Sequence, residues 1–229
     1  MSTTTETQLL RVMALGMVPY EAAWALQRSL VAARSAGQCR DTLLLLEHPP
    51  TITLGNKARL EHVLLPLEEL ARRGVALVQS DRGGDVTYHA PGQLVGYPIL
   101  KLSRHGGDIG RYVRNIEETI IQLLASYGII AGRVSGLTGV WIAPDDPLRS
   151  AKIAAIGVKL SASGVTSHGF ALNIAPDLAG FRQIVPCGIT NRGVTSIQAL
   201  LGTAPTVAEV RQQVIMTFAA IFGVTPIEE

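Results

Sequence analysis

Apolar residues recur at the spacing of an amphipathic helix in three segments of the chain. These segments are residues 18–37, the stretch between Asp108 and Gly128, and residues 206–222, which Gly223 ends. Pro19 suits the first turn of the first helix, and Asp108 can cap the second. A shorter helix is predicted at residues 66–73, because Gly74 follows it and can end it.

Short apolar runs that end at glycine or proline predict strands between these helices. The predicted strands are residues 42–46, 51–54, 75–78, 86–88, 94–97, 140–142, 152–160 and 165–174. The last two predict a hairpin around Ser163 and Gly164, and the run at 86–97 predicts another around Pro91 and Gly92. Strands and helices mix without a steady βαβ alternation, which favours an α+β fold with a mixed, mainly antiparallel sheet and packed helices.

The bulk properties indicate a compact globular protein. The chain has 229 residues, of which 47% are hydrophobic and 17% charged, so it can bury a core without a metal or a disulfide. We found no internal repeat or shift in composition, and we expect one domain over residues 1–229 with a polar N-terminal tail at about 1–8.

Charge and hydropathy exclude several functions and locations. A net charge of +2 without a basic stripe argues against nucleic-acid binding. No apolar run reaches the length of a membrane span, and the N-terminus lacks the pattern of a signal peptide. We therefore expect a cytoplasmic protein in which the two cysteines, Cys39 and Cys187, stay reduced.

A glycine-rich run at residues 82–98 is the first candidate for a site. It contains Arg82, Gly83, Gly84, Asp85, Val86, Thr87, Tyr88 and His89. Glycine lets a ligand approach the backbone closely, and the polar side chains beside it can bind that ligand. The spacing fits no nucleotide-binding fingerprint. The alternative interpretation is an ordinary glycine-rich hairpin.

Three residues in the second half are further candidates. Lys152 is the single charge in an apolar segment, His168 precedes a glycine in a predicted strand, and Cys187 lies between Pro186 and Gly188. Each has a structural alternative, since a lysine can lie at a sheet edge, and histidine and cysteine are often buried. The turn at Cys187 favours an exposed thiol, whereas the surroundings of Cys39 do not, so Cys39 is interpreted as structural.

Several motifs in fixed order resemble one enzyme family. They are RGGDVTYHAPGQLVGYPI, KIAAIGVKL, TSHGFALNI and IVPCGI, with VPYEAAWALQ, DTLLLLEHPPTITLG and VTSI beside them. This set resembles the lipoyl(octanoyl) transferases, which are octanoyl-[acyl-carrier-protein]:protein N-octanoyltransferases, over about residues 18–200. The resemblance implies the catalytic fold of biotin and lipoate protein ligases.

The resemblance also implies a mechanism of protein lipoylation without metal or cofactor. Cys187 would accept the octanoyl group from octanoyl-acyl carrier protein as a thioester, and Lys152 would be the second member of a Cys-Lys dyad. The acceptors would be lysines of lipoyl domains in 2-oxoacid dehydrogenase complexes and of the glycine cleavage H protein. Residues 82–89 would contact the acyl substrate, and so would a second group: Ala155, Ile156, Gly157, Gly169, Phe170 and Ala171.

Some features depart from that family and some alternatives stay open. Ala90 and Asn56 stand where the family usually has glycine and arginine, and the added methyl group of Ala90 is expected to lie beside the pocket. Lys159 is an alternative partner for Cys187. An ATP-dependent lipoate or biotin ligase and a non-catalytic acyl-binding module are the competing functions, and neither needs a nucleophilic cysteine.

Overall fold

The computed structural model describes residues 8–186 and 192–228. The strands are β1 (Gln8–Met17), β2 (Asp41–Glu47), β3 (Thr51–Leu54), β4 (Ala76–Gln79), β5 (Val86–His89), β6 (Gln93–Ile99), β7 (Ala131–Val134), β8 (Leu137–Ile142), β9 (Ala151–Leu160), β10 (Thr166–Asn173), β11 (Gly193–Val194) and β12 (Val224–Glu228). The helices are α1 (Tyr20–Ser35), α2 (Leu67–Arg72), α3 (Ile109–Ser126), α4 (Ile197–Leu201) and α5 (Val207–Phe222), with short 3₁₀ helices at Leu60–His62, Leu102–His105 and Leu178–Gln183.

The strands form a large and a small sheet. Within the described residues the large sheet has nine strands in the order β12-β1-β2-β6-β10-β9-β8-β7, with β11 paired to β9. Strand β1 runs parallel to both of its neighbours, and the pairs from β2 to β7 are antiparallel. The small sheet has the order β4-β3-β5. The predicted α+β fold with a mixed, mainly antiparallel sheet is confirmed.

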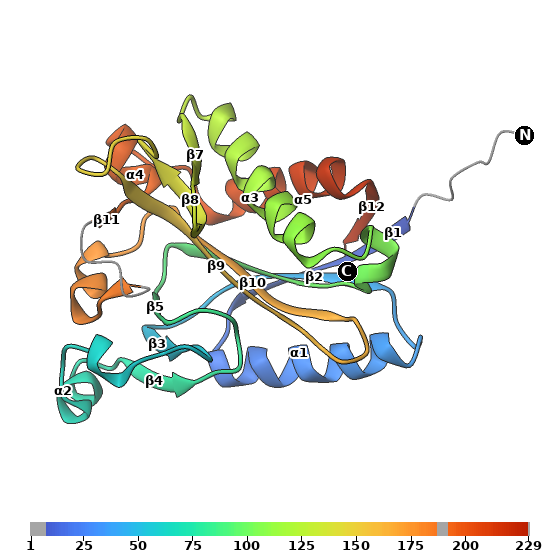
Figure 1. The fold of residues 1–229 in the computed structure, drawn as a ribbon, viewed down its shortest axis with the longest axis horizontal. Helices are drawn as coiled ribbons and strands as arrows, with labels where there is room; N and C mark the ends of the chain where they lie inside the picture. The colour runs from blue at the N-terminus through green and yellow to red at the C-terminus, as the bar shows by residue number, and fades with distance from the viewer. Residues whose placement is uncertain (1–7, 187–191, 229) are drawn as a thin grey trace, which may run out of the picture.

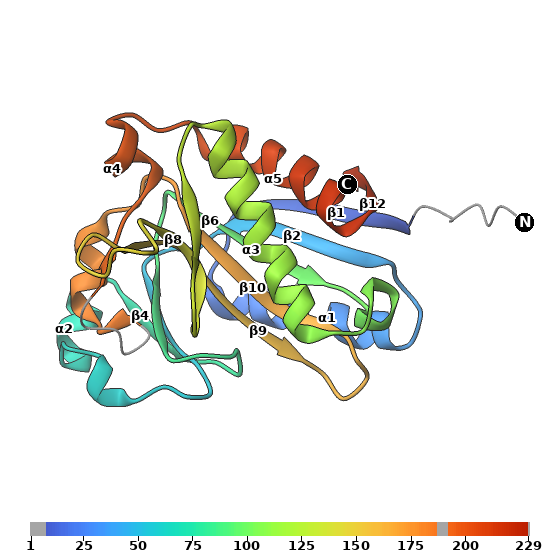
Figure 2. The same ribbon diagram turned by 45° about the horizontal axis from the view of Figure 1, so that its top comes forward.

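Helices cover both faces of the large sheet (Figures 1 and 2). Helices α3 and α5 pack on one face, and α1 packs on the other. Strand β2 shows why: Leu43 and Leu45 belong to the first core cluster, whereas Leu44 and Leu46 belong to the second. Because successive side chains point to opposite faces, a continuous run of leucines serves both layers.

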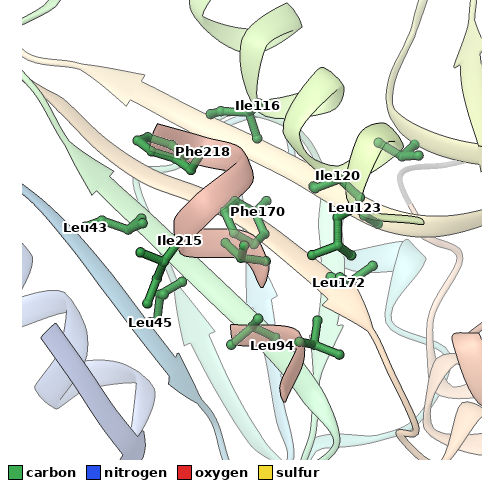
Figure 3. Close-up of a cluster of buried hydrophobic side chains, with 14 of the residues drawn as sticks. Leu43, Leu45, Leu94, Ile116, Ile120, Leu123, Phe170, Leu172, Ile215 and Phe218 are labelled. Carbon is green, nitrogen blue, oxygen red and sulfur yellow. The ribbon is translucent and has the colours of Figure 1, made fainter. Parts of the chain in front are cut away.

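The core beneath α3 and α5 is shown in Figure 3. Ile116 and Ile120 from α3 and Phe218 from α5 lie over Phe170 and Leu172 of β10, and all five are at most 2% exposed. The apolar stripe predicted for the second helix is therefore mostly buried. Its first member, Ile109, remains 38% exposed, because the helix begins there and its first turn lies outside the core.

The helix ends follow the local signals in the sequence. The Asp108 carboxylate accepts a hydrogen bond from the Arg111 N–H at 2.5 Å, which caps α3. Thr206 and Glu209 form a reciprocal capping box at the start of α5, and Gly223 follows its last turn. The predicted helices at 18–37 and 66–73 are each shorter by one or two residues at both ends.

Two predictions about strands are corrected. Residues 86–97 do not form a hairpin: β5 pairs with β3 in the small sheet, and β6 pairs with β2 and β10 in the large one. The Pro91–Gly92 turn carries the chain between the sheets, and the Gly92 N–H donates to the Glu47 carboxylate at 2.7 Å. The polar tail was placed at about 1–8, but Gln8 already belongs to β1, which the sequence pattern did not predict.

Close backbone contact between β6 and β10 gives a testable prediction for stability. A Cβ atom on Gly169 would lie 2.1 Å from the Gly96 carbonyl oxygen. Gly169→Ala is expected to lower the free energy of unfolding by about 1–3 kcal/mol, because backbone atoms must move. Urea denaturation measures this, with Gly110→Ala on the exposed first turn of α3 as the control, expected to change stability by less than about 1 kcal/mol. Equal effects of both changes would contradict the packing argument.

None of the helices in residues 8–186 and 192–228 combines the length and the apolar character that crossing a membrane requires.

Candidate active site

The glycine-rich run is held in place by the guanidinium group of Arg82. That group donates hydrogen bonds to the Thr53 hydroxyl at 3.0 Å and the Thr53 carbonyl at 2.6 Å, and to the carbonyls of Gly83 at 3.0 Å and Asp85 at 2.7 Å. The Gly83 N–H also donates to the Val158 carbonyl on β9 at 3.0 Å. The 82–85 loop is therefore fixed between β3 and β9, with a buried cation tying its carbonyls together.

A small cavity of about 40 Å³, called the inner cavity here, opens beside this loop. It is lined by Tyr20, Arg82, Gly83, Gly84, Thr87, His89, Tyr97, Ala155, Ile156, Gly157, His168, Gly169, Phe170 and Ala171. The fold thus brings the glycine-rich run together with both predicted segments of β9 and β10. The glycine-rich run meets the β9–β10 hairpin there, although the two are distant in sequence, because β6 pairs with β10 and the Gly83 N–H bonds to Val158 of β9.

Not every residue of the 82–89 run faces this cavity. Thr87 and His89 line it, whereas Val86 and Tyr88 point to the other face of β5 and pack in a separate core cluster with Phe181. The alternation of a strand explains the division. Asp85 lies outside the inner cavity, where its carboxylate accepts hydrogen bonds from His62 at 2.5 Å and from the Arg59 N–H at 3.2 Å.

The expected position of Ala90 is also corrected. Ala90 is 4% exposed and belongs to the same core cluster as Tyr88, and it does not line the inner cavity. Its methyl group therefore fills space in the small-sheet core rather than narrowing the pocket. Asn56 is exposed, and its N–H donates to the Arg82 carbonyl at 2.9 Å.

Two tyrosines and two histidines, Tyr20, Tyr97, His89 and His168, line the inner cavity, and His48 lies behind them in contact with Tyr97 and His89. His48 donates from Nδ1 to the Val18 carbonyl at 2.6 Å and accepts from the Tyr97 hydroxyl at Nε2 at 2.8 Å. His89 donates from Nδ1 to Gln93 Oε1 at 2.7 Å. Burial lowers the pKa of His48 to about 4, and burial followed by the nearby His48 lowers the pKa of His89 well below its usual value. Both rings are therefore uncharged at neutral pH.

His168 is the second histidine in the lining of the inner cavity. Its backbone has φ 56°, in the left-handed region that non-glycine residues rarely adopt, and its N–H donates to Gln27 Oε1 at 2.8 Å. Nε2 donates to the Asp81 carboxylate at 2.7 Å, and Lys159 donates to the other oxygen of that carboxylate at 2.5 Å. Burial lowers the pKa of His168 despite this carboxylate. These bonds hold His168 in its position and engage the ammonium of Lys159.

The buried histidines predict how stability depends on pH. His48 titrates near 6.5 in the unfolded chain and near 4 in the folded one, so the unfolded chain binds more protons between these values. The titration of His48 alone is expected to lower the free energy of unfolding by about 3 kcal/mol as the pH falls from about 6.5 to about 4. Urea denaturation over this range measures it. His48→Gln keeps hydrogen-bonding groups but does not titrate, and an unchanged slope in that variant would contradict the assignment.

A second, larger cavity of about 490 Å³, called the outer cavity here, adjoins the first. Its lining residues are Lys57, Gly83, Gly84, Asp85, Val113, Gly136, Leu137, Thr138, Lys152, Ile156, Gly157 and Val158. Gly83, Gly84, Ile156 and Gly157 line both cavities, so they form the boundary between the two. Exposed residues such as Lys57 and Thr138 place the outer cavity at the surface.

Lys152 lies where this outer cavity meets the interior. Its side chain is buried on β9, with Nζ 4.7 Å from the centroid of the Trp141 ring on β8. Its stem passes Gly139, where a Cβ atom would come within 3.4 Å of the lysine Cε. Lys152 is thus a buried cation held over an aromatic face, not an edge residue whose head reaches open water.

Cys187 lies outside the residues that the structure describes. The described residues on both sides of it approach Lys152: Pro186 and Lys152 line the same small cavity of about 20 Å³, and Val194 of β11 pairs with Lys152 of β9. Cys39 is at the far end of α1, where it is half-buried and its thiol lies 3.8 Å from the Leu30 carbonyl. Burial raises the pKa of this thiol, although Arg34 and Arg11 oppose the shift.

Sequence reasoning missed several residues around these cavities. Tyr20 and Tyr97 line the inner cavity, and Trp141 supports Lys152. Tyr20 and Tyr97 are within the quoted motifs VPYEAAWALQ and RGGDVTYHAPGQLVGYPI, which is the signal that could have identified them. Trp141 had no such signal, because its contact with Lys152 depends on the pairing of β8 with β9.

The architecture is that of the catalytic domains of lipoate and biotin protein ligases. A bipartite lipoate protein ligase from Thermoplasma acidophilum, solved in a study that included its E2 lipoyl domain, matches with a TM-score of 0.71 and 17% identity, covering 97% of this chain and 87% of that one. A biotin protein ligase from Aquifex aeolicus in complex with biotin and ATP matches with a TM-score of 0.52 and 12% identity, covering 93% of this chain and 69% of that one. These matches define the fold alone.

The chain belongs to the family described as the lipoyl protein ligase A/B catalytic domain, whose model matches residues 19–219. A protein of Chloroflexus aggregans named octanoyltransferase is 63% identical over 218 residues, covering 95% of this chain and 97% of that protein. One of Roseiflexus with the same name is 56% identical over 212 residues, covering 93% of this chain and 87% of that protein. The prediction of an acyltransferase of this family is confirmed.

Proposed function

We propose that the protein transfers an octanoyl group from octanoyl-acyl carrier protein to a lysine of a lipoyl domain, through a thioester on Cys187. The observation that carries this proposal is the similarity of nearly the whole chain to proteins named octanoyltransferase. Two observations support the proposed dyad: Lys152 is buried, and Pro186 and Val194, which lie on either side of Cys187 in the sequence, are near it. In this proposal residues 1–229 form one catalytic domain.

In the first step Cys187 attacks the carbonyl carbon of the carrier thioester. A new carbon–sulfur bond to the Cys187 thiolate forms and the bond to the carrier's sulfur breaks. The released thiolate takes a proton from the Lys152 ammonium, which leaves Lys152 neutral. A free thiol has a pKa of about 8.5 and is mostly protonated at neutral pH. The ammonium of Lys152 is proposed to favour the reactive thiolate by its positive charge.

In the second step a lysine amine of the lipoyl domain attacks the acyl-enzyme. An amide bond forms, the bond to Cys187 breaks, and the amine loses a proton. Lys152 in its neutral form is proposed to accept that proton and return to the charged state. Backbone N–H groups of the glycine-rich loop are candidates for stabilising the oxyanion in both steps, and His89 is a candidate for orienting the incoming group.

The acyl chain is proposed to bind in the inner cavity, among Ile156, Phe170 and Ala171. Together with Ala155, these residues present apolar side chains to a narrow cavity, which suits an alkyl chain. The guanidinium of Arg82 donates hydrogen bonds to Thr53, Gly83 and Asp85, and the other lining side chains are uncharged at neutral pH, which agrees with an alkyl chain as the ligand.

The acceptors are proposed to be the lipoyl domains of 2-oxoacid dehydrogenase complexes and the glycine cleavage H protein. The cytoplasmic location expected from the sequence stays a prediction. The donor is already an activated thioester, so neither ATP nor a metal ion is required by the proposed chemistry. An ATP-dependent ligase shares the fold but activates a free acid, and it remains the principal alternative.

The test is octanoyl transfer to a purified lipoyl domain, with octanoyl-acyl carrier protein as donor and with EDTA present. We expect amide formation at the same rate with and without ATP. The matched reaction contains free octanoate, ATP and magnesium, and we expect no product from it. Product from free octanoate alone, with a strict need for ATP, would overturn the transferase in favour of the ligase.

A further inference from the structure

The inner and outer cavities share a wall, and the chemistry of their linings differs on the two sides of it. Their shared wall is Gly83, Gly84, Ile156 and Gly157. Inward from this wall the lining includes Phe170 and Ala171. Outward from it the lining includes Thr138 and Asp85. Lys152, the proposed partner of the nucleophile, lines the outer cavity close to the shared wall.

When a thioester reacts beside Lys152, its acyl chain and the group attached through sulfur must therefore extend to different sides of the shared wall. The acyl half occupies the inner cavity under the proposed function, which leaves the outer cavity for the half attached through sulfur. At about 490 Å³ the outer cavity is within the range of small-molecule sites. Its lining carries three charged side chains, Lys57, Asp85 and Lys152, which an alkyl chain alone would leave without a polar ligand group.

We infer that the outer cavity binds the pantetheine arm of the acyl donor, and that Lys57 binds the phosphodiester at the far end of that arm. This inference rests on the proposed function. The arm carries two amides, which suit a wall of glycine backbone at Gly83, Gly84, Gly136 and Gly157. Such a wall lets the arm approach the backbone closely, because no side chain covers it.

Charge distinguishes the two ends of the outer cavity. Lys152 is buried at the inner end, and Lys57 is exposed. The third charged side chain in the lining, Asp85, already accepts hydrogen bonds from His62 and from the Arg59 N–H. The Lys57 N–H donates to the Gly84 carbonyl at 3.0 Å, which ties the backbone of this lysine to the glycine-rich loop. An anionic group at the open side of the cavity thus meets an exposed cation carried by that loop.

The experiment compares two small donors that differ by one phosphate: octanoyl-phosphopantetheine and octanoyl-pantetheine. Lys57→Met is expected to lower kcat/KM for the phosphorylated donor roughly threefold to tenfold and to leave the other within about twofold. Lys101→Met is the control, since Lys101 lines neither cavity and donates to the Ser163 carbonyl. An equal loss on both donors, or no loss on either, overturns the role of Lys57.

A second variant tests the cavity itself. Thr138→Trp places a large ring at an exposed position in the outer wall, where folding should be unaffected. We expect kcat/KM for octanoyl-pantetheine to fall about tenfold, while octanoyl-N-acetylcysteamine, which has only the first amide, stays within about twofold. Equal effects on the long and short donors overturn the site. Failure of the unaltered protein to use octanoyl-acyl carrier protein would instead overturn the proposed function.

Discussion

Cys187→Ala is expected to abolish octanoyl transfer, lowering kcat by at least about a thousandfold. The change removes the sulfur atom that forms the thioester, and loss of a nucleophile has effects of this size in other enzymes. The rate of octanoylation of a lipoyl domain measures it, and the fold of the variant is checked by its unfolding midpoint.

Cys39→Ala is the matched control for this experiment. Cys39 is at the far end of α1, half-buried, and its thiol pKa is raised by burial. We expect this variant to retain at least half of the activity. Substantial turnover by Cys187→Ala, or inactivity of Cys39→Ala with its fold intact, would contradict a covalent mechanism on Cys187.

Lys152→Met is expected to slow transfer by about a hundredfold or more. An ammonium within about 4–6 Å lowers the pKa of an acid by about one to three units, so its removal should shift the reactivity of Cys187 to higher pH by that amount. The measurement is the rate of iodoacetamide alkylation against pH, in a Cys39→Ala background so that one thiol reacts. Methionine retains the apolar stem that passes Gly139 and Trp141.

Two further variants separate charge from proton transfer. Lys152→Arg keeps the cation but cannot accept a proton at neutral pH, so we expect near-normal alkylation and slow transfer to the lipoyl domain. Lys159→Met is the matched control, since the Lys159 ammonium is 2.5 Å from the Asp81 carboxylate, seven residues along the same strand. An unchanged alkylation profile in Lys152→Met would show that Lys152 does not activate the thiol.

The elements predicted well from the sequence are those specified by neighbouring residues. The cap at Asp108 and the β9–β10 hairpin depend on residues close in the chain, and the structure confirms both. The hairpin predicted at residues 86–97 was wrong because strand pairing there is non-local. Strand β5 finds its partner in β3, more than thirty residues earlier in the chain.

The candidate site shows the same limit. The motifs identified the segments that meet at the inner cavity. They could not show which side chains of residues 82–89 face the cavity and which face the core, because that depends on how β5 lies in the small sheet. Val86 and Tyr88 then belong to the core, and Thr87 and His89 to the cavity. Trp141 has no motif of its own, because its role comes from packing against Lys152 across two strands.

The central claim, an acyl-enzyme on Cys187, is tested most directly by mass spectrometry of the intact protein. The protein is mixed with octanoyl-acyl carrier protein, without a lipoyl domain and without nucleotide, and is quenched in acid. We predict a mass increase of one octanoyl group, located by peptide mapping at Cys187, lost on treatment with hydroxylamine and discharged when a lipoyl domain is added. No increase in mass, in protein that still transfers octanoyl groups when both substrates are present, would contradict the account.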